Sequence, residues 1–167
     1  PTPSYCRCNG LRVVAEYERK PCWIGKAEVR RPAESATHRD VASLVYGSLL
    51  REAWEAKAGL EAEGVTGRLV NVRMPKPIDV DAVLSAARES SLLVTVEDHF
   101  LTGGLFSIVS ETLVRHGQTA AVLPIALQRR WFKPALLPDV LRYGGLTAEQ
   151  IAARILARLP AHACKGA

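Results

Sequence analysis

Residues 93–105 read LVTVEDHFLTGGL and decide the fold of this 167-residue chain. Their first part belongs to the short, apolar and β-branched run 92–96, which is typical of a buried parallel strand. A polar loop with a Gly-Gly pair follows, and then come apolar residues at helical spacing, which end at Gly117. Strand, loop and helix in this order predict one unit of a parallel α/β sheet.

The same alternation extends in both directions from this unit. We predict further strands over 41–46, 69–72 and 120–125. Helices are predicted over 49–63, from Asp79 or Asp81, and from the capping-box sequence at 147–150 to Pro160, with a short helical piece near Val140. On the first helix, Leu50, Ala53, Trp54 and Ala58 are expected to share the buried face. The pattern therefore predicts an α/β domain with about four parallel strands.

The first 40 residues lack this alternation. Two short β-compatible segments, 11–17 and 26–31, occur there without a helix between them, so we expect connecting or edge elements. A domain boundary is expected near residues 23–25.

Composition narrows the class of protein. The chain is 48% hydrophobic and 23% charged, as in a folded globular domain, and carries a formal charge of +5. Its basic residues are scattered, so we expect no nucleic-acid partner. No apolar run approaches the roughly 18 residues of a membrane span, and the first residues do not resemble a signal peptide. We therefore expect a soluble cytoplasmic protein without a membrane partner.

The cysteines predict neither disulfides nor zinc. Cys6, Cys8, Cys22 and Cys164 are too few and too unevenly spaced for a disulfide framework. No second pair of ligands completes a zinc knuckle, so no metal site is expected on this chain.

Ionisable residues gather at the end of the 92–96 strand, where ligands of parallel sheets bind. Glu97, Asp98 and His99 could form a carboxylate–imidazole pair for proton transfer, and Gly103-Gly104 could present backbone N–H groups to an anion. Alternatively, this polar loop serves packing or a protein interface, and the two carboxylates argue against a phosphate ligand. The sequence contains no Gly-x-Ser-x-Gly elbow, P-loop or dinucleotide fingerprint.

Residues 93–105 resemble the C-terminal domain of transketolase-type thiamine diphosphate enzymes. The resemblance continues in order through Gly25-Lys26-Ala27-Glu28-Val29, Tyr46-Gly47-Ser48, Pro75-Lys76-Pro77-Ile78-Asp79, Lys133-Pro134-Ala135 and Tyr143-Gly144-Gly145-Leu146-Thr147. It implies a three-layer α/β/α domain over 25–167 with a mixed, mostly parallel sheet of about five strands, one of them antiparallel. In this family Glu97, Asp98, His99, Gly103 and Gly104 would form an interface or a loop supporting the site.

Residues 1–24 resemble the end of the pyrimidine-binding domain of the same family. Tyr5-Cys6-Arg7-Cys8-Asn9 matches its last strand, which implies that Arg7 binds the substrate phosphate. A guanidinium suits that role because it can bind phosphate oxygens bidentately. The cysteines on both sides of Arg7 depart from the family pattern.

The resemblance also implies a partner. The family binds thiamine diphosphate and a divalent metal, Mg or Ca, on a pyrophosphate- and a pyrimidine-binding domain whose motifs are missing here. We expect a larger partner chain to carry both domains in a hetero-oligomer, and this chain to have no catalytic residue of its own. It would be a split subunit or a C-terminal fragment.

The expected activity is transfer of a two-carbon ketol unit between sugar phosphates by a two-chain, transketolase-like enzyme. Within the family, the alternative is that this chain is part of a 1-deoxyxylulose-5-phosphate synthase or of a 2-oxo acid dehydrogenase beta subunit. A non-catalytic interaction module is the alternative outside it.

Overall fold

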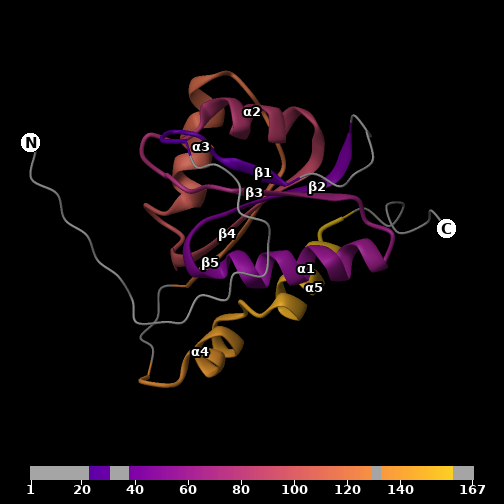
Figure 1. Cartoon of the computed structure of the whole chain (residues 1–167), viewed down its shortest axis with the longest axis vertical. Coiled ribbons are helices and arrows are strands. Elements are labelled where there is room, and N and C mark those ends of the chain that lie inside the picture. The colour runs from indigo at the N-terminus through magenta and orange to yellow at the C-terminus, as the bar shows by residue number, and fades with distance from the viewer. Residues whose placement is uncertain (1–22, 31–37, 129–132, 160–167) are drawn as a thin grey trace, which may run out of the picture.

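A five-stranded mixed sheet forms the middle layer of the domain, with helices on both faces (Figure 1). The computed structural model describes residues 23–30, 38–128 and 133–159. The strands are β1 (Glu28–Arg30), β2 (Arg39–Val45), β3 (Gly67–Asn71), β4 (Ser90–Phe100) and β5 (Val122–Leu127). The helices are the 3-10 turn η1 (Gly47–Leu49), α1 (Leu50–Ala62), α2 (Val80–Arg88), α3 (Leu105–Arg115), α4 (Leu137–Gly144) and α5 (Ala148–Leu156).

The sheet has the order β1-β3-β2-β4-β5, and only β1 runs antiparallel to its neighbour. β2 lies parallel to both β3 and β4, and β4 lies parallel to β5. The expected three-layer fold with one antiparallel strand is thereby confirmed. Because Glu28 pairs with Asn71, the last residue of β3, the start of β1 lies at the carboxyl edge of the parallel strands.

Alternate residues of the strands bury two apolar clusters, one on each face. Val41, Val45, Val94 and Val96 pack with α1 and α5, whereas Ala42, Leu44 and Leu93 pack with α2 and α3. Strands buried on both faces read as continuous apolar runs, which is why 92–96 was a clear signal in the sequence.

Two expectations about the elements were wrong. Ala53, Ala56 and Leu60 form the buried face of α1, whereas Trp54 and Ala58 are exposed. Arg30 and Lys57 cover the Trp54 ring instead, 5.3 and 5.8 Å from its centroid. Residues 97–100 belong to β4 rather than to a loop, because Phe100 regains pairing with Leu127 after an irregularity that follows Val96.

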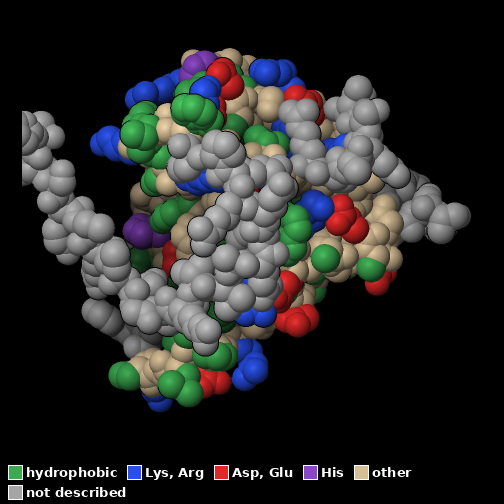
Figure 2. Space-filling view, in the orientation of Figure 1, with side chains coloured by type: hydrophobic (Ala, Val, Ile, Leu, Met, Phe, Trp, Pro, Cys, Tyr) green, Lys and Arg blue, Asp and Glu red, His purple; other side chains and the backbone are tan. Residues whose placement is uncertain are grey.

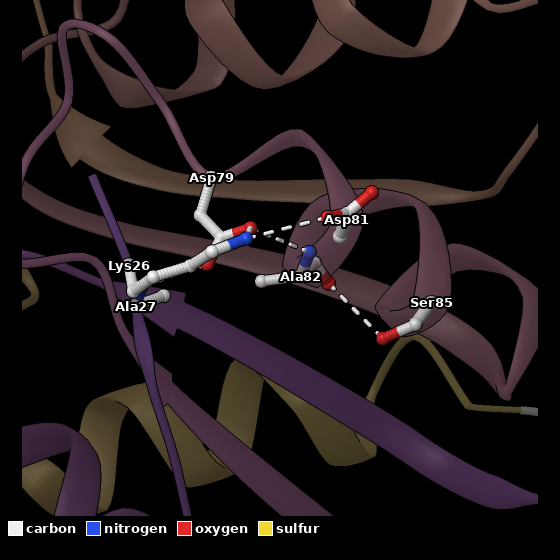
Figure 3. A network of polar contacts seen from close by, with 6 residues as sticks. All are labelled: Lys26, Ala27, Asp79, Asp81, Ala82 and Ser85. Carbon is white, nitrogen blue, oxygen red and sulfur yellow. Dashed lines mark hydrogen bonds and ion pairs between the residues drawn. The ribbon is translucent and has the colours of Figure 1, made fainter. Parts of the chain in front are cut away.

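Asp79 joins residues 26–27, which lead into β1, to the start of α2 (Figure 3). It is the N-cap of α2: Oδ1 accepts from the Ala82 N–H at 3.2 Å, while Oδ2 accepts from the Ala27 N–H at 2.9 Å. Lys26 lies 3.6 Å from the same carboxylate and 3.3 Å from Asp81. One buried carboxylate thus caps a helix and holds the residues that precede β1.

Several expectations fall outside the described residues. They concern the four cysteines, Arg7 and the segment 11–17. In the part that is described, none of the helices has the length and apolar composition that crossing a bilayer requires.

We predict that Asp79→Ala lowers the free energy of unfolding by about 2 kcal/mol, because a helix cap is lost and the Ala27 N–H loses its acceptor. Urea denaturation would measure this. Asp81→Ala is the matched control, since the Asp81 side chain is 88% exposed and its change should stay within about 0.5 kcal/mol. Equal losses in the two variants would contradict the role of Asp79.

Candidate functional site at the carboxyl edge of the sheet

The chain changes direction across the sheet between β2 and β4. The helix after β2, α1, packs on one face, and the helix after β4, α3, packs on the other. In open parallel sheets the crevice at such a switch point is the usual place for a ligand. Residues 46–48 and 97–100 lie at this position, so the expected site residues are brought to one edge.

Glu97 fills the space at the start of α3. Its side chain is fully buried, with Oε2 accepting from the Leu105 N–H at 2.6 Å and Oε1 accepting from the Phe106 N–H at 2.9 Å. The first N–H groups of a helix have no partner within it and carry partial positive charge. A carboxylate from the preceding strand therefore takes the place that an external anion would occupy.

Gly104 is required by this arrangement. A Cβ on Gly104 would lie 1.9 Å from Oε2 of Glu97 and 2.8 Å from the Phe100 carbonyl oxygen. Its φ of −90° is open to any residue, so the close approach and not the backbone conformation demands glycine. Gly103 has a φ of +82° and supplies the turn.

Burial raises the pKa of the Glu97 carboxyl above its ordinary value. The two backbone N–H groups and the nearby His99 lower the pKa and offset part of that rise, and the charge of Asp98 adds to it. Burial, followed by the charges of Glu97 and Asp98, also raises the pKa of the Tyr46 hydroxyl.

Asp98 links the end of β4 to the turn after β2. Its Oδ2 accepts from the Ser48 hydroxyl at 2.5 Å, and its Oδ1 lies 3.3 Å from the position of a Cβ on Gly47. Gly47 has a φ of +76°, so it allows both the turn and this approach. The sequence pattern did not connect Ser48 with Asp98, because 50 residues separate them.

His99 is exposed at the same edge. Its Nδ1 lies 3.0 Å from the Phe100 carbonyl oxygen, and since a carbonyl only accepts, Nδ1 carries the proton in this contact. The two neighbouring carboxylates bind the start of α3 and Ser48 instead of the imidazole. This geometry favours a packing or interface role over a proton-transfer pair.

The described residues do not fit a metal-held diphosphate. Among residues 23–30, 38–128 and 133–159, no three His, Cys, Asp or Glu side chains form a group that could bind a metal ion. The N–H groups at the start of α3 are already bound to Glu97, and the Asp98 carboxylate lies at the same edge, which disfavours an anionic ligand. We derive no chemical step through the cofactor at this edge.

Comparison with known proteins explains the order of these motifs. Residues 25–151 match the family model described as transketolase, C-terminal domain. A 1-deoxy-D-xylulose-5-phosphate synthase of Thermomicrobium roseum is 37% identical over 158 residues, which are 95% of this chain and 24% of that protein. The enzyme of the same name from a Synechococcus species is 35% identical over 163 residues, 97% of this chain and 24% of that protein.

A solved structure shows a similar fold. The protein described as a split gene transketolase, inactive beta4 tetramer, has a TM-score of 0.71 and 30% sequence identity to this chain. The match covers 80% of this chain and 42% of the solved one. This chain therefore spans less than half of that structure and about a quarter of the curated relatives.

We predict that Gly104→Ala costs about 3 kcal/mol of unfolding free energy, because the new methyl group collides with a buried carboxylate and a backbone carbonyl. Gly59→Ala is the matched control: Gly59 lies in α1 with nothing within 4 Å of its added Cβ, so this change should stabilise by about 0.5–1 kcal/mol. Thermal and urea denaturation of both variants measures the difference. A tolerated Gly104→Ala would contradict the assigned packing.

We further predict that Glu97 makes stability depend on pH. With a pKa raised in the folded state, the folded protein holds a proton that the unfolded chain has released. The stabilisation by Glu97 is therefore complete below its ordinary pKa of about 4.5 and declines as the pH rises through the raised value.

Urea denaturation of the native protein and of Glu97→Gln between pH 4 and 8 tests this expectation. The stability difference, native minus variant, should fall with rising pH. A difference that rises with pH would mean that the hydrogen bonds outweigh burial.

Proposed function

This chain belongs to the transketolase C-terminal domain family, and on that premise we propose that it completes a thiamine diphosphate-dependent transferase whose cofactor-binding domains lie outside these 167 residues. The observation that carries the proposal is the carboxyl edge of the sheet. There Glu97 binds the start of α3, Asp98 accepts from the Ser48 hydroxyl, and His99 and Phe100 are exposed. Such an edge suits contact with another protein surface better than catalysis by the domain alone.

The leading reaction is ketol transfer between sugar phosphates by a two-chain enzyme. The similarity to a solved transketolase supports it, because the description of that protein names a split gene. In this arrangement a larger chain carries the pyrophosphate- and pyrimidine-binding domains, thiamine diphosphate and a divalent metal. Arg7, which lies outside the described residues, would bind the substrate phosphate from the segment 1–24.

Synthesis of 1-deoxy-D-xylulose 5-phosphate is the second candidate. The relatives from T. roseum and Synechococcus carry that activity in their names, and their identities of 37% and 35% exceed the 30% of the split transketolase. Under this proposal the chain is the C-terminal quarter of a synthase or a separate chain that replaces it.

We predict that the isolated chain neither binds thiamine diphosphate nor turns over substrate, and that a chain carrying the two missing domains restores activity. The physical reason is that the reaction depends on a cofactor held by a metal and activated by a carboxylate, and the edge described above has no such arrangement. Calorimetry with thiamine diphosphate measures binding. Assays of ketol transfer and of 1-deoxy-D-xylulose 5-phosphate formation measure turnover by the chain alone and with the partner.

The two assays also separate the candidates. Ketol transfer by the mixture supports the transketolase proposal, and formation of 1-deoxy-D-xylulose 5-phosphate supports the synthase. Tight cofactor binding or turnover by the pure chain would overturn both.

A further inference from the structure

Exposed apolar side chains concentrate at the carboxyl edge of the sheet. Eight large hydrophobic side chains are exposed among the described residues, and six of them belong to segments at this edge. We call Phe100, Leu136, Leu137 and Tyr143 the strand-end surface, whereas Trp23 and Ile24 precede β1, which lies on the opposite side of the sheet from β5. Soluble domains seldom leave so much apolar area open without a binding function.

Leu127 brings two of these segments together. As the last residue of β5 it pairs with Phe100, and its Cδ2 lies 3.6 Å from the position of a Cβ on Gly144 at the end of α4. Leu136, the N-cap residue of α4, and Tyr143, near the end of the helix, are 76% and 60% exposed. Hydrophobic side chains gather over α4 at the lower end of Figure 2.

The two remaining exposed side chains do not belong to this surface. Trp54 is covered by Arg30 and Lys57, as described above. Val114 lies at the other end of the domain, because α3 begins at the carboxyl end of β4 and runs back along the sheet. Val114 is 78% exposed, which makes it a matched control for any test of the strand-end surface.

The path of the chain indicates which part of a larger enzyme would cover the strand-end surface. Trp23 and Ile24 directly precede the matched domain and lie near the carboxyl end of β3, because β1 starts beside Asn71. Asp79 holds the next residues, Lys26 and Ala27, at this edge. The matched model is a C-terminal domain, and this chain covers only 24% of its synthase relatives, so about three quarters of such an enzyme precedes this point. The described chain thus enters the domain at the carboxyl edge of the sheet, the same edge at which the strand-end surface lies.

We propose that the strand-end surface is the docking face for the preceding, cofactor-carrying part of the enzyme, whether that part lies on the same chain or on a partner chain. The proposal rests on the proposed function. Phe100, Leu136 and Tyr143 supply the apolar contact, while Asp98, His99 and Arg142 form a polar rim. The partner surface should therefore be an apolar patch of a folded protein, bordered by polar groups.

Hydrogen–deuterium exchange on the assembled enzyme and on this chain alone tests the docking face. Amides of residues 98–101 and 136–143 should exchange at least tenfold more slowly in the assembled enzyme, and those near Val114 at an unchanged rate. No difference at the strand-end surface, or equal protection at Val114, would overturn the proposal.

Two variants test the contact itself. For the two-chain enzyme, Tyr143→Asp should raise the dissociation constant measured by sedimentation velocity at least tenfold, whereas Val114→Asp should change it less than twofold. For a single chain, the same comparison uses the exchange protection of residues 98–101. Equal effects of both variants would overturn the proposal, as would a dimer of this chain alone that Tyr143→Asp dissociates, because a second copy would then be the occupant.

The outcome also separates this surface from the proposed function. Protection of the strand-end surface in an assembly that lacks both transferase activities would refute the function and leave the docking face standing. An active enzyme with an unprotected strand-end surface would refute the docking face alone.

Discussion

The fully buried carboxylate of Glu97 determines how the carboxyl edge of the sheet is built. A charge in this position would be costly if it were unpaired, but two N–H groups at the start of α3 face it at 2.6 and 2.9 Å. These N–H groups would otherwise lack acceptors, so the β4 carboxylate and the start of α3 provide each other's hydrogen-bond partners. The contact requires Gly104 and directs residues 98–100 outward, where they form part of an exposed surface.

The same device recurs elsewhere in the domain. Asp79 caps α2 and also holds the backbone of Ala27, and Oε2 of Glu52 on α1 accepts from the Ala148 N–H at 2.8 Å at the start of α5. Each carboxylate connects a helix start with a distant segment, 96 residues away for Glu52 and Ala148. Local caps thus become tertiary links, because one side chain serves two parts of the chain.

This construction bears directly on function. At the switch point between β2 and β4, where open parallel sheets usually bind ligands, Asp98 accepts from Ser48 and Glu97 binds the start of α3. The apolar side chains that surround this edge are exposed, as expected of a protein interface. Family membership and geometry are thus both consistent with the proposal that this domain assembles with others and that the cofactor-dependent chemistry lies outside it.

The sequence by itself determined the alternation of strands and helices, a helix start at Asp79 or Asp81, the capping box at 147–150 and the family, since these depend on local patterns along the chain. The structure decided for Asp79. It also identified Glu97, Asp98, His99, Gly103 and Gly104 as a group. The tertiary structure alone decided what they do: that Glu97 caps α3, that Asp98 binds Ser48 and that β4 continues to Phe100. The buried face of α1 was also decided there, because cations cover Trp54. These outcomes depend on contacts between residues that are far apart in the sequence, and the spacing of residues along the chain does not reveal such contacts.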